Sequence, residues 1–327
     1  MENILITGAA GYIGRCLARE LSGNDTVRKI VGLDIRPPRE KINKFIFCRR
    51  DVRDPVDDLL REHQIDVVVH TAFILPPIHD TKRMEDINVN GTRNVLKASL
   101  AAGVRQFLYT SSTTAYGFHP DNHCPLTEES TLRGNDDLTY SKTKKEIEAI
   151  FRELDLSKLY PDTAVTVLRP CFVVGPGFDN PLARYLQKRI VLLPIRMQPL
   201  QYVHEEDLIR AICLLIEKKK GGVYNVAADG LMTFEEMVRL LGNRKIYLPF
   251  AVMYHLNRIA WSLRLTFLSE FPSPTMNMLR YPWWAQNDKL KTDLGFRYRY
   301  TTEEAFRDFA ALVHRRKGSR IREKSSS

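Results

Sequence analysis

Residues 8–14 read GAAGYIG, directly after the apolar run NILIT (3–7) and before RCLAREL (15–21). The three glycines, Gly8, Gly11 and Gly14, therefore lie between a predicted strand and a predicted helix. In such a turn the first glycine lets the chain reverse tightly, the second lets the backbone approach a pyrophosphate, and the third lets the helix pack closely on the sheet. The first turn of the helix offers free N–H groups to the phosphates. This stretch predicts a dinucleotide-binding turn.

An acidic residue lies at the position that contacts the adenosine ribose in dinucleotide-binding folds. Asp34 ends the next apolar run, twenty residues beyond Gly14. A carboxylate at the end of the second strand accepts hydrogen bonds from the adenosine ribose hydroxyls and repels a 2′-phosphate. We therefore predict NAD as the cofactor. Arg36 lies two residues further on and keeps NADP open as the alternative.

Short apolar runs alternate with helical patterns through the first half of the chain. The runs are 4–7, 30–34, 45–48, 67–70, 107–112 and 165–169, and the helical patterns include 15–21, 55–63, 88–102 and 140–154. Apolar strands separated by helices are typical of a parallel sheet that is covered on both faces. The predicted fold class is therefore α/β, a Rossmann-type doubly wound parallel sheet with a smaller C-terminal α/β lobe for the substrate.

The alternation changes after Arg169, where proline-marked segments begin. From there we expect a strand at 222–226 and helices near 207–216, 234–242 and 302–314. We predict that residues 1–169 form an NAD-binding domain and that 201–227 returns to it. The remainder would be a substrate-binding lobe over 170–314 and a basic, disordered tail over 315–327.

The formal net charge of +10 raises the question of an anionic partner. Residues 315–327 hold six basic residues and one acidic residue, so +5 of the +10 lies in this tail and the rest is thinly spread. This distribution is typical of a solvated end rather than of a nucleic-acid interface. We therefore predict a small-molecule substrate and no nucleic-acid partner, with contact of the tail to nucleic acid or anionic lipid as the alternative.

The cysteine pattern and the hydropathy of the chain indicate in which cellular compartment the protein is expected. The five cysteines are scattered without CxxC spacing, which is typical of reduced thiols rather than of a disulfide framework. No run reaches the roughly 18 apolar residues that a membrane span needs, and no secretory signal is visible, so we expect a cytoplasmic protein without an integral span. The nearest approach is 246–268, which is interrupted by His255, Asn257, Arg258 and Arg264. We interpret this segment as a buried or cleft-lining helix, with peripheral membrane contact as the alternative.

A second pair of motifs carries reaction chemistry. YTSSTTAYG (109–117) ends the fifth apolar run, and YSKTK (140–144) places Tyr140 and Lys144 four residues apart, on one face of a helix. A free tyrosine has a pKa of about 10, and an adjacent ammonium lowers that pKa toward neutrality. Ser112, 28 residues before Tyr140, offers a hydroxyl to a substrate oxygen. A tyrosine–lysine pair alone is often a surface feature, but beside a dinucleotide-binding turn it predicts a catalytic site.

Two further clusters contain residue types that bind metal ions. HPDNHC (119–124) contains His119, His123 and Cys124, but no second ligand pair accompanies them and Pro120 favours a loop. HEED (204–207) is predicted to begin a helix, because acidic residues are favoured in a first turn. We therefore predict no metal.

The GxxGxxG spacing and the serine, tyrosine and lysine motifs resemble the extended short-chain dehydrogenase/reductases, and within them the NAD-dependent epimerase/dehydratase family. The resemblance covers nearly the whole chain and is greatest to members like UDP-glucose 4-epimerase. It includes RDVRD (50–54), VVHTA (68–72), INVNGTRNVL (87–96), LRPCFVVGPG (168–177), YVHEEDL (202–208) and GVYNVA (222–227). It implies an enzyme that transfers hydride between NAD and a secondary alcohol or ketone.

The resemblance also implies roles for individual residues. The catalytic positions are Ser112, Tyr140 and Lys144, of which the last two also contact the cofactor. The other cofactor-binding positions are Gly8, Gly11, Tyr12, Ile13, Gly14, Asp34, Asp51, Val52, Thr71, Ala72, Phe73, Asn88 and Cys171. Residues 12–13 would lie against the pyrophosphate, 51–52 beside the adenine and 71–75 beneath the cofactor, with Asn88 and Cys171 near the nicotinamide. In this family two helices, here 88–102 and 140–154, pair across a two-fold axis into a homodimer.

Two departures from the family pattern leave the substrate open. Nucleotide-sugar enzymes of this family typically carry asparagine where this chain has Phe172 and arginine where it has Leu200, so a diphosphate would lose a hydrogen bond and a cation. The basic residues available as substitutes are Arg184, Lys188, Arg189 and Arg196.

The leading interpretation is a nucleotide-sugar epimerase or dehydratase. The alternative is an NAD(P)H-dependent ketoreductase, resembling 3β-hydroxysteroid dehydrogenases and dihydroflavonol reductases, that takes a hydrophobic ketone. A third hypothesis is a catalytically idle NAD-binding regulator, against which the intact serine, tyrosine and lysine argue.

Overall fold

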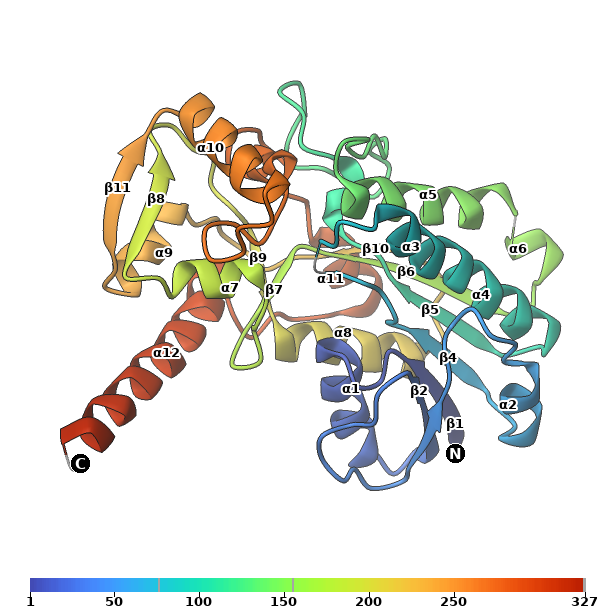
Figure 1. Cartoon of the computed structure of the whole chain (residues 1–327). Helices are drawn as coiled ribbons and strands as arrows, with labels where there is room; N and C mark the ends of the chain where they lie inside the picture. Colours follow the sequence, from blue (N-terminus) through green and yellow to red (C-terminus); the bar gives the residue numbers. More distant parts are fainter. Residues whose placement is uncertain (76, 155, 326–327) are drawn as a thin grey trace.

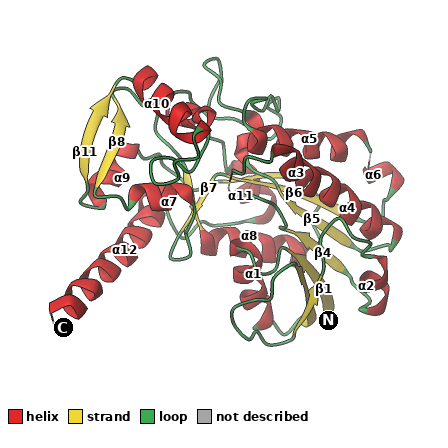
Figure 2. Ribbon diagram, in the orientation of Figure 1, coloured by secondary structure: helices red, strands yellow, loops and turns green. Residues whose placement is uncertain are grey.

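The computed structural model describes residues 1–75, 77–154 and 156–325. Within these residues, seven strands form one parallel sheet, which lies in the half of the molecule that contains the N-terminus (Figures 1 and 2). Their spatial order is β10 (Gly222–Val226), β6 (Ala164–Pro170), β5 (Gln106–Thr110), β4 (Val67–His70), β1 (Glu2–Thr7), β2 (Val27–Asp34) and β3 (Phe45–Arg49). The winding reverses between β1 and β4, and in such sheets ligands bind in the crevice at the carboxyl ends of the strands beside that point. The predicted Rossmann-type fold class is confirmed.

The alternating side chains of β1 show how the sheet is buried on both faces. Ile4 and Ile6 pack in one cluster with α1 (Tyr12–Ser22) and α8 (Glu205–Lys218). Leu5 points the other way, into a cluster with α2 (Asp57–Glu62), α4 (Gly91–Ala101) and α5 (Thr139–Glu153). Successive residues of a strand face opposite sides of the sheet, so a continuous apolar run is what two helix layers require.

The C-terminal part packs around a further apolar cluster, to which buried residues between 115 and 138 also contribute. Two short parallel sheets, β7 (Phe172–Val174) with β9 (Tyr202–His204) and β8 (Ile190–Pro194) with β11 (Arg244–Leu248), support it. The remaining elements are α3 (Thr81–Glu85), η1 (Asp86–Asn90), η2 (Thr113–Tyr116), α6 (Leu156–Leu159), α7 (Pro181–Leu186), α9 (Phe234–Leu240), α10 (Phe250–Ser262), η3 (Ser273–Leu279), α11 (Asp288–Leu294) and α12 (Thr302–Ser325). Strand β10 belongs to the large sheet beside β6, while the division of the chain into domains stays a prediction.

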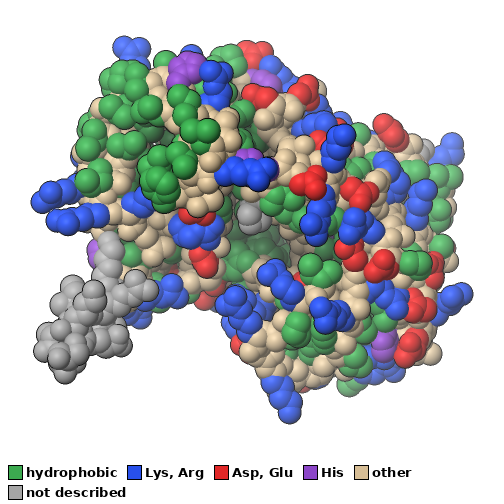
Figure 3. Space-filling model, in the orientation of Figure 1, with side chains coloured by type: hydrophobic (Ala, Val, Ile, Leu, Met, Phe, Trp, Pro, Cys, Tyr) green, Lys and Arg blue, Asp and Glu red, His purple; other side chains and the backbone are tan. Residues whose placement is uncertain are grey.

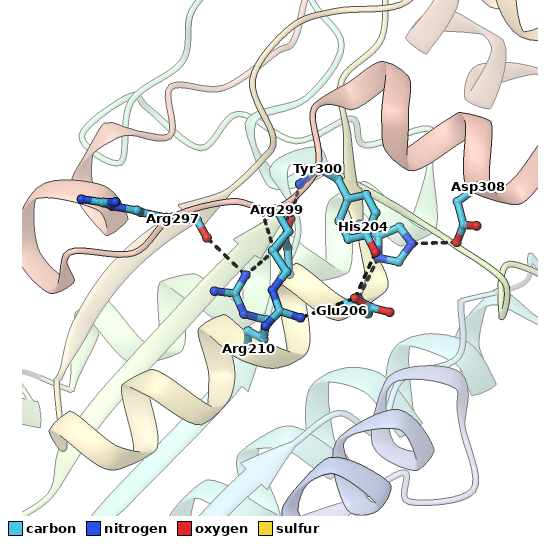
Figure 4. A network of polar contacts seen from close by, with 8 residues as sticks. His204, Glu206, Arg210, Arg297, Arg299, Tyr300 and Asp308 are labelled. Atoms are coloured by element: carbon cyan, nitrogen blue, oxygen red, sulfur yellow. Dashed lines mark hydrogen bonds and ion pairs between the residues drawn. The ribbon is translucent and has the colours of Figure 1, made fainter.

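A polar network fixes helix α12 to the end of β9 (Figure 4). The Nδ1 atom of His204 accepts a hydrogen bond from the backbone N–H of Glu206, so Nε2 donates to Asp308 at 3.2 Å. The ring of Tyr300 stacks on His204 with centroids 3.9 Å apart. HEED thus begins helix α8 as predicted, with His204 as its capping residue.

Two segments differ from the sequence-based expectation. In 246–268 the structure places α10, but only Met253 and Ala260 of this helix are buried, so it is not a buried helix; that it lines a cleft stays a prediction. At the C-terminus α12 continues to Ser325, where the sequence predicts a disordered tail; residues 326–327 lie outside the described residues.

A buried ion pair joins helix α5 to the sheet. Glu148 and Arg169 approach to 2.6 Å, and their side chains are only 2% and 4% exposed. The guanidinium of Arg169 also donates to the hydroxyl of Tyr116 and to the carbonyl of Glu128. Every charged atom of the pair therefore has a partner, which is the condition under which a buried pair is tolerated.

We predict that Glu148→Gln destabilises the protein by about 3–5 kcal/mol, because it leaves the Arg169 guanidinium buried without its counter-charge. Urea unfolding measures this loss. Glu146→Gln is the matched control, since Glu146 lies on the same helix at 38% exposure and, among the described residues, its one ion pair is with Lys142; we expect a loss of at most about 0.5 kcal/mol there. Equal stabilities of the two variants would contradict the account.

Candidate active site

The glycine turn brings three segments to one point at the carboxyl edge of the sheet. Gly8 has a φ of +70°, and a Cβ atom there would lie 2.7 Å from the backbone of Ala72. The N–H of Gly11 donates to the carbonyl of Gly8 at 2.9 Å, and a Cβ at Gly14 would collide with the same carbonyl. The end of β1, the start of α1 and the loop after β4 can approach this closely only because these residues have no side chain.

Helix α1 begins at this turn with its N–H groups uncapped by any side chain. Its N-cap residue is Gly11, which offers no side-chain hydrogen bond, and its first turn contains no acidic residue. The partial positive charge of the helix end is therefore not neutralised from within the helix. This is the arrangement in which a helix terminus binds a phosphate.

The ends of β2 and β3 carry the acidic residues that the sequence singled out. The carboxylate of Asp34 accepts hydrogen bonds from the backbone N–H groups of Ala10 and Arg36, at 3.0 and 3.1 Å. Asp51 is bound by the side chain of Arg53, which lowers the pKa of the Asp51 carboxyl. Val52 is buried beside it. These residues therefore lie at neighbouring strand ends on the same edge as the glycine turn.

Tyr12 does not direct its hydroxyl into the glycine turn. It donates to Glu205, which also accepts the backbone N–H of Gly177 at 2.8 Å. Burial and the charge of Glu205 raise the pKa of Tyr12 well above its usual value. The phenol thus links α1 to α8 and to the second lobe, whereas the family resemblance places this residue against a pyrophosphate. Glu205 was missed because nothing in the local sequence pairs it with Tyr12.

The loop after β4 is held from beneath by Asn88. This fully buried amide accepts from the N–H of Ile74 at 2.8 Å and donates to the carbonyl of Ile74 at 3.3 Å. Asn88 lies in the π-helical turn η1, a rare local geometry that is often found at functional sites. Its side chain therefore orients the loop, with Thr71 bonded to the carbonyl of Thr7 at 2.7 Å on the other side. The expectation that Asn88 hydrogen-bonds near a nicotinamide stays a prediction.

Lys144 lies in a buried cage made by three aromatic rings and a carbonyl. Its ammonium donates to the carbonyl of Thr110 at 2.7 Å and to the hydroxyl of Tyr109 at 3.2 Å. It also lies 3.7 Å from the centre of the Phe73 ring, a cation–π contact. Burial lowers the pKa of Lys144 to about 7, so its charge changes near neutral pH. Phe73, on the loop after β4, thus contacts Lys144 directly.

Tyr140 lies beside this cage, at the start of α5. Its ring packs edge-on against Phe73, with centroids 5.4 Å apart. Burial raises the pKa of Tyr140, and the neighbouring hydroxyls of Ser112 and Thr114 lower it by less. The ammonium of Lys144 is directed at Thr110 and lies 5.9 Å from the Tyr140 ring centre, so the lowering of this pKa by Lys144 stays a prediction.

The two serines of the TSST motif have different surroundings. Ser111 donates to the buried Glu148 at 2.5 Å and so belongs to the ion pair that holds α5. Ser112 is buried at the end of β5 and caps the short helix η2 by accepting the N–H of Thr114 at 3.2 Å. Ser112 is therefore the serine that faces Tyr140. Thr114 is a further hydroxyl at this position that sequence reasoning missed, although the same motif contains it.

Cys171 follows β6 at the far side of the crevice, where burial raises the pKa of its thiol. Ile13 is half-buried in the first turn of α1.

His119, which the sequence placed in a possible metal site, instead bonds the carbonyl of Gly134 at 2.7 Å. Among the described residues no group of three or more His, Cys, Asp or Glu side chains could hold a metal ion. In the same part of the chain no helix is long and apolar enough to cross a membrane.

Relatives with similar sequences include both uncharacterized and named proteins. An uncharacterized protein of Mycobacterium tuberculosis is 28% identical over 315 residues, which are 94% of this chain and 82% of the relative. A UDP-glucose 4-epimerase of Vibrio cholerae is 27% identical over 253 residues, covering 73% of this chain and 75% of the relative.

Solved structures share the fold over nearly the whole chain. The UDP-glucose 4-epimerase of Thermotoga maritima, solved with UDP-glucose, superposes with a TM-score of 0.76 at 20% identity, covering 96% of this chain and 99% of that one. The UDP-glucuronic acid 4-epimerase of Bacillus cereus, in complex with NAD, gives a TM-score of 0.73 at 20% identity and the same coverage. The sequence model of the NAD dependent epimerase/dehydratase family matches residues 4–227. The chain belongs to this family.

Proposed function

We propose that this protein binds NAD across the carboxyl ends of β1, β2 and β4 and catalyses reversible hydride transfer at a secondary alcohol of a nucleotide sugar, as an epimerase. The observation that carries the proposal is the convergence of Ser112, Tyr140 and Lys144 beside the glycine turn. Tyr140 and Lys144 touch Phe73, on the loop that also packs against Gly8 through Ala72. The groups proposed to transfer the proton and the proposed cofactor site are thus in contact with the same loop.

The residues present fit a dinucleotide. Gly8 and Gly11 leave the space that a Cβ would fill, and the uncapped end of α1 offers N–H groups to a pyrophosphate. Asp34 would accept the adenosine ribose hydroxyls, while the loop at 51–52 would flank the adenine. NAD held there would supply the hydride acceptor for the substrate carbon and, once reduced, the hydride donor.

The protein's own groups would move the proton that accompanies the hydride. Tyr140 would take the proton from the substrate hydroxyl as the carbonyl forms and give it back as the carbonyl is reduced. Ser112 would donate a hydrogen bond to the same oxygen and orient it. Lys144, whose ammonium is set by burial to titrate near pH 7, would stabilise the phenolate and bond the nicotinamide ribose.

The likeness to UDP-sugar enzymes supports a nucleotide-sugar substrate, and the two departures from the family pattern favour a second candidate. Phe172 stacks on Tyr202 and meets Trp283 edge-on, with centroids 5.7 and 5.3 Å apart, and Leu200 is buried beside them. Of the substitute cations, Arg184 is paired with Glu270, and Lys188 donates to the carbonyl of Phe267. This apolar wall suits a hydrophobic ketone, which would make the protein a ketoreductase, while Arg189 and Arg196 remain exposed as cations for a diphosphate. We also propose a homodimer through α4 and α5.

We predict that Tyr140→Phe lowers kcat by about 10²–10⁴-fold, because positioned proton transfer contributes that much, and leaves NAD affinity nearly unchanged. Lys144→Ala should weaken both, because the ammonium serves phenol and ribose together. Steady-state kinetics and NAD titration measure these effects, and a thermal melt controls for folding. Undiminished turnover by well-folded Tyr140→Phe would remove the catalytic assignment.

We predict that Asp34 gives the protein a preference for NAD, at least tenfold in Kd over NADP, because the carboxylate would face a 2′-phosphate. Asp34→Ala should reduce the preference, since Arg36 remains to bind the phosphate. Asp25→Asn, at the opposite end of β2, is the matched control and should leave both constants unchanged. Equal or tighter binding of NADP by the unaltered protein would overturn the assignment.

A further inference from the structure

Helix α10 presents an unbroken apolar face to solvent. Val252, Leu256, Ile259 and Leu263, which follow one another at intervals of four, three and four residues, share one side of the helix. Leu256, Ile259 and Leu263 are 54%, 56% and 64% exposed. The face continues past the helix to Phe267, which is 71% exposed. The fold does not bury this face, because the buried residues of α10, Met253 and Ala260, lie on the adjacent side of the helix.

The apolar surface extends to the neighbouring edge of β8 and β11. Its large exposed side chains there are Ile190, Ile195 and Ile246. Figure 3 shows hydrophobic side chains gathered over this lobe, interspersed with Lys and Arg. We call the combined surface, from α10, the segment after it and the β8–β11 edge, the α10 face. An exposed apolar patch of this extent marks an interaction site.

The segments that form and border the α10 face carry an excess of positive charge. Residues 181–200 and 241–268 contain eight Lys and Arg and no Asp or Glu. In the described part of the chain, five exposed arginines of these segments form no ion pair, namely Arg189, Arg196, Arg244, Arg258 and Arg264. The nearby acids Glu235 and Glu270 are already paired with Lys245 and Arg184. An apolar helix face bordered by unpaired cations is the pattern of an interfacial helix.

We propose that the α10 face docks on a membrane surface rich in anionic lipids, with the apolar side chains in the acyl boundary and the arginines at the headgroups. A second copy of the chain is a poor occupant, because a two-fold contact would bring the same cations together. A nucleic acid would match the charge but not the apolar centre. On its inner side α10 stacks Trp261 on His79, with centroids 4.1 Å apart, so the membrane would lie beside the loop that follows β4.

The test is flotation of the full chain with phosphatidylcholine vesicles that contain roughly 30 mol% phosphatidylglycerol. We expect binding that pure phosphatidylcholine does not support and that salt weakens. The pair Arg189→Gln with Arg258→Gln should reduce the partition constant by roughly 25-fold, about fivefold for each guanidinium near the surface. Leu256→Glu with Leu263→Glu should reduce it by at least about tenfold, because it places charge in the acyl boundary.

Matched controls come from the other side of the molecule. Leu159→Glu changes a leucine that is 60% exposed, and Arg61→Gln with Lys97→Gln removes two exposed cations; neither should alter flotation. Unchanged NAD affinity and melting temperature show that the α10 variants remain folded. Flotation that is absent, or equal in all variants, overturns the proposal. So does a change of solution mass on Leu256→Glu with Leu263→Glu, which would assign the face to a second copy, or arginine-dependent binding of a DNA duplex in preference to vesicles.

Discussion

The buried pair of Glu148 and Arg169 fixes the position of the helix on which the proposed chemistry depends. Lys144 and Tyr140 lie four and eight residues before Glu148, one and two turns along the same face of α5. Because Arg169 belongs to β6 and Ser111 to the end of β5, the pair ties this face to two neighbouring strands at once. A small shift of α5 would move the phenol and the ammonium relative to the glycine turn, and displacements of about 1 Å at such sites cost roughly 10²-fold in rate.

Besides this rigid support, the site contains two ionisable groups, Tyr140 and Lys144. Burial shifts the pKa of each in the direction that favours its uncharged form. Desolvation raises the pKa of Tyr140 and lowers that of Lys144, since each charged form loses water. The ammonium of Lys144 bonds the carbonyl of Thr110 and lies over the ring of Phe73. These contacts, rather than a carboxylate, offset part of the cost of burying its charge. A proton can then exchange at Tyr140 near neutral pH only when further interactions favour the phenolate, and Ser112 and Thr114 supply part of them.

The spacing of residues along the sequence was enough to predict the features that lie within one or two neighbouring elements. The glycine turn, the parallel sheet, the strand-end Asp34 and the Tyr140–Lys144 pair each follow from residues within one or two elements. The contacts that sequence reasoning missed join distant segments: Tyr12 to Glu205, Asn88 to Ile74, and Ser111 to Glu148. The exposure of α10 was also missed, because an apolar helix that faces solvent and one that faces a core have the same composition. Which one it is depends on what the tertiary fold leaves uncovered.

The central claim is that the site takes a hydride from a nucleotide sugar and returns it to the same molecule. Incubating the protein and NAD with UDP-glucose, while recording absorbance at 340 nm and separating the sugar nucleotides by chromatography, tests it directly. The account predicts that UDP-glucose and its 4-epimer reach equilibrium without net accumulation of NADH. Stoichiometric oxidation of NADH with a hydrophobic ketone, and no interconversion of the UDP-sugars, would contradict it.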